Sequence, residues 1–304
     1  MSADPTLVLV SNRGPATFER DGESGELVAK RGGGGLVTAL TGLVNHRDAL
    51  WIASAMSEAD AAAGREHGGG SFECDVEGTS YKIRVVESDP DAYDAFYNVI
   101  ANPMLWFIQH YLWDLSNAPD IRQNEVDAYE QGYVVVNDDL ANAVLDEIKD
   151  EEEVVVMLHD YHLYTAPRAI RRQRPDVFLH HFIHIPWTQP DYWRILPRDM
   201  REDIFEGILA NDIVSFHTRH YRRNFLLCCR ELFDLEVDEE AGLVKIDDRE
   251  VWVRAYPLPI SAETFAKSAQ RPSVHEYERQ ILRRRREHMI LRVDRADLSK
   301  NVLR

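Results

Sequence analysis

Short apolar runs recur along the chain and alternate with segments of helical periodicity. The runs are rich in Val, Ile and Leu, and they cover residues 7–12, 50–55, 81–87, 154–161, 177–186 and 211–218. Between some of them, over 138–149 and 164–173, apolar positions repeat with the period of an amphipathic helix. Apolar strands separated by helices are typical of a parallel sheet that is covered on both faces. The pattern therefore predicts an α/β fold with a doubly wound, mostly parallel sheet.

The last part of the chain carries different patterns. Residues 242–257 hold two apolar runs, "GLVKID" and "VWVRAYP", which predict an antiparallel or edge-like pair. The charged stretch "EYERQILRRRREHMI" (276–290) predicts a helix, and "MILRVD" (289–294) predicts the opening strand of another unit. We therefore expect an N-terminal domain over 1–260, a hinge or linker helix over 261–288, and the beginning of a second domain over 289–304.

Charge and composition narrow the classes of partner. The 304 residues carry 35 Lys and Arg against 52 Asp and Glu, a net charge of −17, which repels nucleic acid and anionic membranes. A phosphate site in this chain would need a local concentration of Arg, Lys and helix N-termini. The three cysteines fit neither a disulfide framework nor a zinc spacing. Neither a membrane-spanning stretch nor a secretory signal is visible, so we expect a cytoplasmic protein without nucleic-acid or membrane partners.

Polar residues follow three of the predicted strands. "SNR" places Arg13 after the first strand, "HDYHL" places Asp160 between two histidines, and "HIP" places His184 after the next strand. Ligands of open α/β sheets bind beyond the carboxyl ends of the strands, so we expect these three residues to converge on one rim. Each also has a structural interpretation. Asp160 alone suits a helix N-cap, and His184 alone suits a core histidine.

A metal site is the weaker interpretation of "HDYHL". His159 and His162 flank Asp160, but no acidic cluster accompanies them, and a His-x-x-His pair on a strand-to-loop turn is a weak signal for a metal. We expect no metal there.

Four consecutive glycines, Gly32 to Gly35, stand in "KRGGGGLVTAL" before an apolar helical run. They fit either a flexible loop or a place where a phosphate approaches backbone N–H groups at a helix start. No Lys-Ser or Lys-Thr pair follows, so neither a P-loop nor a dinucleotide fingerprint applies. In the phosphate interpretation, Gly35→Val is expected to abolish binding of the phosphate, because the added side chain would occupy the space of a phosphate oxygen. Gly32→Ala, at the outer end of the loop, is then expected to cost little because a flexible entry absorbs one methyl group.

Six ordered motifs together resemble the trehalose-6-phosphate synthase family: "LVLVSNRGP", "RGGGGLVTAL", "LHDYHLYTAPRAIR", "HFIHIPWTQPDYWRILP", "ANDIVSFHTRHYRRNFL" and "VDRADLSKN". The resemblance runs from about residue 7 to the last residue. It implies a two-domain glycosyltransferase of the GT-B type, with two Rossmann-like domains and the active site in the cleft between them. The N-terminal domain would hold a sugar-phosphate acceptor, and the C-terminal domain a nucleotide sugar. Transfer in this family retains configuration by front-face attack and needs no metal or other cofactor.

The resemblance also implies which residues bind the acceptor. Arg13 and Tyr97 match the pair that grips the 6-phosphate of the acceptor. Trp106 matches a tryptophan of the acceptor pocket, and Asp160 matches the aspartate that binds acceptor hydroxyls.

A second group of residues matches the donor side. Gly34 and Gly35 match the loop that lies against the donor diphosphate, and His184 matches the histidine beside the transferred glucose. Arg295 and Lys300 match the cations that neutralise the leaving diphosphate, where negative charge builds as the glycosidic bond breaks. With Asp160, the residues His184, Arg295 and Lys300 form the expected catalytic set.

Three stretches depart from the family pattern. Ser54 in "WIASAMSE" stands where a tryptophan is usual, "HIPWTQPDYWRILP" replaces a commoner "HIPFP" form, and Pro259 stands where a glycine is usual. "WIASA" and "HIPW" also resemble the pseudo-glycosyltransferase that makes validoxylamine 7′-phosphate. We expect transfer from UDP- or GDP-glucose to glucose 6-phosphate, giving trehalose 6-phosphate. Glycerol 3-phosphate or a cyclitol phosphate as acceptor, and a non-catalytic regulatory subunit, stay open alternatives, as do the donor base and a homo-oligomer.

Overall fold

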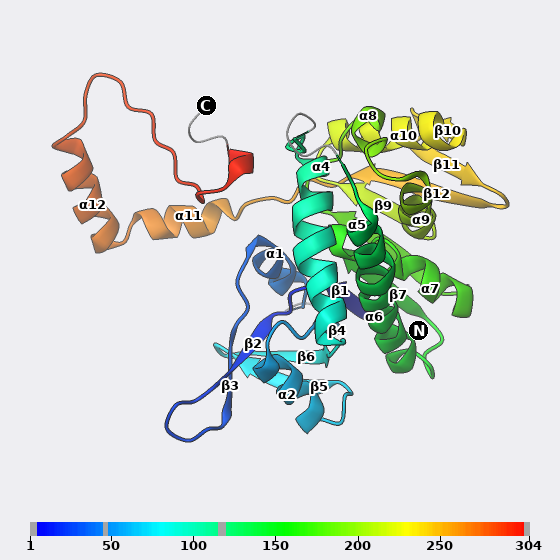
Figure 1. Ribbon diagram of the computed structural model, residues 1–304. Helices are drawn as coiled ribbons and strands as arrows, with labels where there is room; N and C mark the ends of the chain where they lie inside the picture. The colour runs from blue at the N-terminus through cyan, green and yellow to red at the C-terminus, as the bar shows by residue number, and fades with distance from the viewer. Residues whose placement is uncertain (1–4, 45–47, 115–119, 301–304) are drawn as a thin grey trace. The chain divides into compact units, whose positions relative to one another are not determined.

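The computed structural model describes residues 5–44, 48–114 and 120–300 (Figure 1). The chain divides into two compact units, Met1–Tyr256 and Pro257–Arg304. The first unit is built around a ten-stranded sheet with the strand order β10-β11-β12-β9-β8-β7-β1-β4-β6-β5. The strands are β1 (Thr6–Ser11), β4 (Ala49–Ser54), β5 (Phe72–Val76), β6 (Thr79–Val86), β7 (Val154–His159), β8 (Phe178–Ile183), β9 (Ile213–Phe216), β10 (Glu236–Asp238), β11 (Leu243–Ile246) and β12 (Arg249–Ala255).

Seven neighbouring strands of this sheet, from β12 to β6, run parallel. The antiparallel strands lie at the two edges, with β5 beside β6 and the β10–β11 pair beside β12. The predicted parallel sheet and the predicted antiparallel pair are thus confirmed. β11 and β12 are not the outermost strands, because β10 pairs with the outer side of β11, while β12 joins β9 in parallel with Trp252 opposite Ile213.

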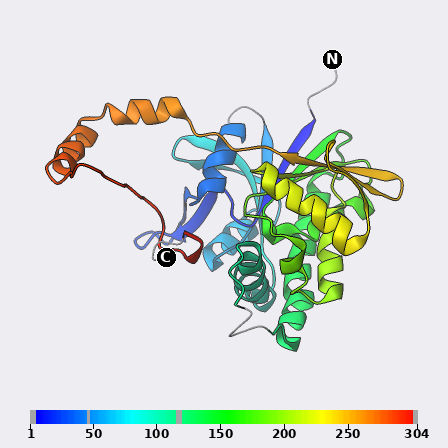
Figure 2. The ribbon, with the colours of Figure 1, turned by 90° about the horizontal axis from the view of Figure 1, so that it is seen from above.

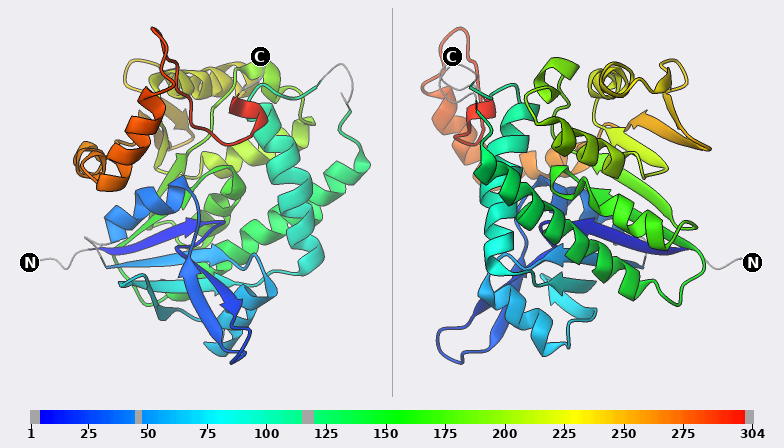
Figure 3. Two further views of the ribbon diagram at one scale, coloured as in Figure 1. Left: turned by 90° about the vertical axis from the view of Figure 1, so that its left-hand side faces the viewer. Right: turned by 45° about the vertical axis from the view of Figure 1, so that its right-hand side comes forward.

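Helices cover both faces of the sheet (Figures 2 and 3). Val8 and Val10 of β1 belong to the larger buried cluster, whereas Leu9 between them belongs to the smaller one. Alternate residues of one strand therefore enter two different cores, as in a doubly wound sheet. The helices that supply most of the larger cluster are η1 (Ala95–Trp106), η2 (Tyr129–Tyr133), α6 (Val134–Glu147), α7 (Ala166–Gln173), α9 (Arg198–Ile208) and α10 (Arg219–Phe233); the smaller one takes residues from α1 (Gly35–Val44) and α2 (Glu58–Glu66).

The short helices and turns of the first unit complete the chain path between these elements. They are α3 (Pro90–Asp94), α4 (Phe107–Gln109), α5 (Gln123–Ala128), η3 (Tyr161–Leu163) and α8 (Pro190–Trp193). η1, which ends at Trp106, has π-helical hydrogen bonding and contains Pro103. Proline has no N–H to donate, so it favours irregular helical bonding around this position.

A hairpin that the sequence did not predict leads from β1 to the glycines. It consists of β2 (Ala16–Arg20) and β3 (Leu27–Arg31), paired antiparallel as a separate two-stranded sheet. Asp21 closes its turn, where its Oδ1 accepts hydrogen bonds from the N–H groups of Glu23 and Ser24. The hairpin returns the chain to the end of β1, and the glycines follow directly.

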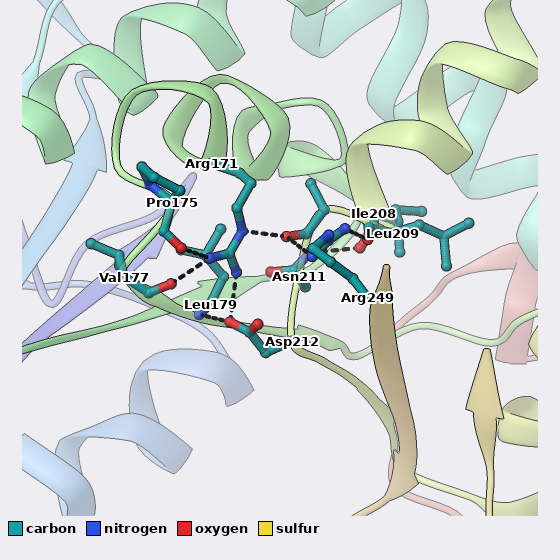
Figure 4. Close-up of polar contacts among 10 residues, drawn as sticks. Arg171, Pro175, Val177, Leu179, Ile208, Leu209, Asn211, Asp212 and Arg249 are labelled. Carbon is teal, nitrogen blue, oxygen red and sulfur yellow. Dashed lines mark hydrogen bonds and ion pairs between the residues drawn. The ribbon is translucent and has the colours of Figure 1, made fainter. Parts of the chain in front are cut away.

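An arginine clamp holds the neighbouring ends of β8 and β9 (Figure 4). Arg171 of α7 donates to the carbonyl oxygens of Ala210, Pro175 and Val177, and its Nη2 lies 2.6 Å from Asp212 Oδ2. Asp212 Oδ2 also accepts the N–H of Leu179 at 2.7 Å. The clamp satisfies carbonyl groups at several chain turns with a single side chain, which stabilises the entry to both strands.

The second unit contains α11 (Ala262–Ala269), α12 (Pro272–Leu282) and the short η4 (Leu298–Lys300). The helix predicted over 276–290 ends at Leu282, where four consecutive arginines begin and like charges disfavour a further helical turn. The strand predicted over 289–294 is wrong. Ile290 is 99% exposed and Val293 is 88% exposed, and no strand of the described residues includes this segment or pairs with it. A strand requires a hydrogen-bonded neighbour, so apolar content alone did not suffice.

Candidate active site

Three predicted site residues lie at one edge of the sheet. Arg13, Asp160 and His184 follow β1, β7 and β8, which are neighbours in the order β8-β7-β1. The chain order reverses at β1, since β4 lies on one side of it and β7 on the other. Such a reversal opens a crevice at the carboxyl ends of the strands, where ligands of this fold class bind.

Arg13 is exposed at this edge and contacts an aromatic group from η1. Its Nη2 donates to the hydroxyl oxygen of Tyr97 at 3.1 Å. The Tyr97 ring stacks with that of Tyr93, at 5.9 Å between centroids, and with that of His162, at 6.0 Å. Within the described residues, no carboxylate forms an ion pair with Arg13. The guanidinium therefore keeps its donors available for an anion, in a chain whose net charge is strongly negative.

Asp160 has a backbone conformation that residues other than glycine rarely adopt, with φ at 72°. Its N–H donates to Phe182 O at 2.8 Å, its C=O accepts from His181 Nε2 at 2.9 Å, and its Oδ1 accepts the N–H of His184 at 3.2 Å. Its side chain makes no N-cap hydrogen bond to η3, so the capping interpretation fails. Burial raises the pKa of Asp160 to about 7, against neighbouring N–H groups that lower it. Strained, fixed and electrostatically perturbed residues are typical of functional sites.

His184 lies half-buried between strand ends. Its ring faces Phe182 at 4.5 Å and His217 at 5.3 Å between centroids, and its Nε2 lies 3.2 Å from Nδ1 of His159. Burial lowers the pKa of His184 to about 3, so the imidazole is neutral at neutral pH. A neutral imidazole offers one donor and one acceptor and leaves no cation beside a ligand.

The four glycines divide into different structural roles. Gly32 is buried, its N–H donates to Pro15 O at 2.7 Å, and a Cβ there would lie 2.2 Å from Gly14 O. The expectation that Gly32→Ala costs little is therefore wrong, because this glycine packs against backbone rather than forming a flexible entry. Gly34 has φ at +124°, a conformation open to glycine and strained for other residues.

Gly33 and Gly35 have no such requirement. A Cβ at either would meet no atom within 4 Å in the described part of the chain, apart from its own neighbours. Gly35 is exposed and is the first residue of α1, whose first turn holds no acidic side chain. The packing of the chain thus explains Gly32 and Gly34 and leaves open space at the helix start for a ligand.

The remaining predicted residues are not brought into direct contact with these groups by any described interaction. Trp106 ends η1, is half-buried, and its ring lies 4.1 Å from that of His110. Arg295 and Lys300 belong to the second unit, where Arg295 Nη2 lies 3.5 Å from Asp297 Oδ2. Roles for these three residues stay predictions.

Sequence reasoning missed several aromatic and histidine contacts. Tyr93 donates to Asn12 Oδ1 at 3.1 Å, and Tyr161 donates to Asn102 Oδ1 at 2.6 Å. His162 was considered only as a metal ligand, yet it stacks on Tyr97. The "HDYHL" motif was the available signal, since its aromatic residues follow a strand that ends at the ligand edge.

Two further findings concern the described residues as a set. They contain no group of three or more His, Cys, Asp or Glu side chains arranged to hold a metal ion. Among 5–44, 48–114 and 120–300, no helix combines the length and the apolar character that a bilayer crossing requires.

The fold defines the class of the protein. A structure of the Candida albicans trehalose-6-phosphate phosphatase N-terminal domain superposes with a TM-score of 0.69 over 93% of this chain and 55% of that chain, at 23% identity. An alpha,alpha-trehalose-phosphate synthase (UDP-forming) from Burkholderia vietnamiensis gives 0.67 over 92% and 55%, at 20% identity. The sheet is thus the Rossmann-like N-terminal domain of a GT-B fold, as expected.

Sequence comparison defines the family. Residues 5–304 match glycosyltransferase family 20, and the chain belongs to this family. It is 32% identical over 307 residues to the alpha,alpha-trehalose-phosphate synthase [UDP-forming] of Pichia angusta. This alignment covers 97% of this chain and 60% of the relative. It is 30% identical over 263 residues to the validamine 7-phosphate valienyltransferase of Streptomyces hygroscopicus subsp. jinggangensis, covering 85% and 52%. The chain spans about half the length of such relatives.

Proposed function

We propose that the protein transfers glucose from UDP- or GDP-glucose to glucose 6-phosphate, with retention and without a metal, and releases trehalose 6-phosphate. The observation that carries this proposal is the Arg13–Tyr97 pair, a guanidinium without an acidic partner in the described residues at the ligand edge of a family 20 chain. A phosphorylated acceptor supplies the missing anion. The net charge of the protein is −17, so a cation at the ligand edge supplies the local positive charge that a phosphate needs.

The acceptor residues have separate tasks in this proposal. Arg13 and Tyr97 bind the phosphate, and Trp106 covers one side of the sugar. Asp160 accepts hydrogen bonds from acceptor hydroxyls, and its fixed backbone keeps the carboxylate in one orientation. A carboxylate that already accepts a backbone N–H loses less entropy when it binds a hydroxyl.

The donor residues act on the other reactant. Gly34 and Gly35 leave room for the diphosphate at the start of α1, whose N–H groups favour negative charge. His184 lies beside the transferred sugar, and Arg295 and Lys300 neutralise the leaving diphosphate. The acceptor hydroxyl attacks from the face that the nucleotide leaves, and a phosphate oxygen takes its proton. The protein contributes position and electrostatics.

A second acceptor class has specific support. The valienyltransferase from Streptomyces hygroscopicus subsp. jinggangensis, 30% identical to this chain, is named for a cyclitol phosphate, validamine 7-phosphate. Ser54, at the end of β4, stands at a position where the resemblance predicted a tryptophan, and its hydroxyl is buried without a hydrogen-bond partner in the described residues. Ser54 and Arg13 line the same pocket, so a smaller and more polar residue at position 54 changes the shape and polarity that an acceptor ring would meet.

A screen of donors against acceptors tests the proposal. The full-length protein is incubated with UDP-glucose or GDP-glucose and with glucose 6-phosphate, glycerol 3-phosphate or a cyclitol phosphate, and the product is analysed by NMR. The proposal requires an α,α-linked disaccharide phosphate from glucose 6-phosphate. Turnover with the cyclitol phosphate alone would instead establish the second class. Arg20→Ala is the matched control for Arg13→Ala, because Arg20 lies on β2 and its side chain donates to Gly25 O and to no other described residue.

A further inference from the structure

His159 contacts the ring of His184 from inside the sheet. It is the last residue of β7, pairs with Phe182 of β8, and is 1% exposed. Its Nδ1 lies 3.2 Å from Nε2 of His184, a distance that requires one hydrogen between the two nitrogens. One ring must therefore donate and the other accept.

Both rings are neutral, so each carries a single N–H. Burial lowers the pKa of His159 well below its ordinary range and that of His184 to about 3. Only two arrangements of the pair remain. Either His159 donates from Nδ1 and His184 carries its proton on Nδ1, or His184 donates from Nε2 and His159 carries its proton on Nε2.

The far nitrogen of His159 distinguishes the two arrangements. His159 Nε2 is buried and has no hydrogen-bond partner within the described residues. A proton there would be a buried donor without an acceptor, which is rarer in proteins than a buried acceptor without a donor. The arrangement with His159 donating leaves only a bare lone pair at that site.

The environment of His184 favours the same arrangement, in which His159 donates. His184 is only half-buried, and its Nδ1 makes no hydrogen bond to any residue of the described ranges. A proton on this nitrogen can be satisfied by water or by a ligand at the edge of the sheet. When His159 donates, the N–H group without a protein partner is therefore on His184 at the binding edge. When His184 donates, that N–H group is on His159 in the buried core.

We propose that His159 is a positioning residue that fixes His184 as its Nδ1–H tautomer, so that His184 donates a hydrogen bond to an oxygen of the transferred sugar. The second half of this statement rests on the proposed function, in which His184 lies beside that sugar. His159 contacts no substrate and acts through the ring of His184. Phe182 and His217 limit the ring's rotation, and the Asp160 carboxylate holds its backbone N–H.

NMR of protein labelled with ¹⁵N-histidine tests the tautomer directly. The resonances of His184 are assigned by their loss in His184→Gln, and their shifts and couplings report which nitrogen carries the proton. The wild-type protein is expected to show Nδ1–H, and His159→Phe, which keeps ring volume but donates no hydrogen bond, is expected to show a mixture or Nε2–H. His159→Asn keeps an N–H donor near the position of Nδ1 and is expected to restore the wild-type signal.

Kinetics of the full-length protein test the consequence. His159→Phe is expected to lower kcat/KM for the nucleotide sugar by roughly two- to ten-fold, as expected for one hydrogen bond, without changing the KM of the acceptor. His159→Asn should recover most of this loss. His180→Phe is the matched control, since His180 also lies on a central strand but contacts Ser215 Oγ at 2.7 Å instead of His184.

The outcomes separate the two proposals. Nε2–H in the wild-type protein, or an unchanged tautomer in His159→Phe, overturns the role of His159 whatever the enzyme does. A switched tautomer with unchanged kcat/KM overturns the hydrogen bond to the sugar. A wild-type protein that transfers no sugar refutes the proposed function, while the NMR comparison still decides whether His159 sets the tautomer.

Discussion

Gly32→Ala tests whether the glycine-rich stretch is built into the fold. The added Cβ would lie 2.2 Å from Gly14 O, whereas ordinary contact begins at 3.4 Å. The two backbone segments must therefore separate by about 1 Å, which also stretches the 2.7 Å hydrogen bond from Gly32 N to Pro15 O. Overpacking costs about 1–3 kcal/mol and a weakened hydrogen bond about 1 kcal/mol, so we expect a loss of about 2–4 kcal/mol.

Gly33→Ala is the matched control. Its Cβ meets no atom within 4 Å in the described part of the chain, and its φ lies outside the left-handed region. We expect stability equal to that of the wild-type protein, or higher by up to about 1 kcal/mol because the unfolded chain loses entropy. Urea unfolding followed by circular dichroism measures the free energy of unfolding of both variants. In thermal unfolding, the melting temperature of Gly32→Ala should fall by roughly 5–15 °C. Equal stabilities for the two variants would refute the packing role of Gly32.

Three further changes probe other parts of the structure. Gly35→Val should leave the melting temperature near the wild-type value but abolish binding of the nucleotide sugar to the full-length protein, and retained binding would contradict a diphosphate at the start of α1. The raised pKa of Asp160 means that the folded wild-type protein binds a proton more tightly than the unfolded chain, so the wild-type protein loses stability as pH rises from about 4 to about 7. Asp160→Asn has no such proton to lose, so its free energy of unfolding should rise relative to that of the wild-type protein by at most about 4 kcal/mol over this range. Urea unfolding at pH 4 and pH 8 measures the difference between the two proteins, and the same difference at both pH values would contradict this prediction. Arg171→Met should lower the free energy of unfolding by roughly 2–4 kcal/mol, because it removes the clamp at β8 and β9. Arg172 is exposed on the same helix, so Arg172→Met should change the free energy of unfolding little. Similar unfolding midpoints for the two variants would show that the clamp contributes no stability.

The sequence predicted the central strands well because strands buried on both faces need continuous apolar runs. The runs at 7–12 and 154–161 became β1 and β7, with shifts of a few residues at their ends. The same reasoning failed at 289–294, where the residues are apolar but no described strand pairs with them. Local composition determines whether a residue can enter a sheet, whereas pairing depends on the rest of the fold.

The glycine-rich stretch shows another limit. The sequence could not distinguish Gly32 from Gly35, because the difference arises from the hairpin β2–β3, which brings Gly14 and Pro15 against Gly32. The turn of that hairpin covers residues 21–26 and begins with the pair Asp21-Gly22, which is a common hairpin signal in a sequence. Its recognition would have predicted that the first glycine packs against the end of β1.

Site residues at strand ends could be predicted from general rules of α/β sheets, but their partners could not. Arg13, Asp160 and His184 follow strands that the apolar pattern located. Tyr97 comes from η1, 84 residues along the chain from Arg13, and only the family resemblance indicated it. The contact between His159 and His184 depends on the register of β7 against β8, which the sequence alone does not define.

Calorimetric titration of glucose 6-phosphate into this chain tests the central claim most directly, that Arg13 and Tyr97 form the phosphate site of an acceptor-binding domain. Glucose serves as the ligand without a phosphate, and Arg20→Ala as the control variant. The account predicts that glucose 6-phosphate binds more tightly than glucose and that Arg13→Ala weakens its binding by roughly ten- to a hundred-fold, as for a charge-assisted contact. Equal affinities of Arg13→Ala and the wild-type chain for glucose 6-phosphate would contradict it.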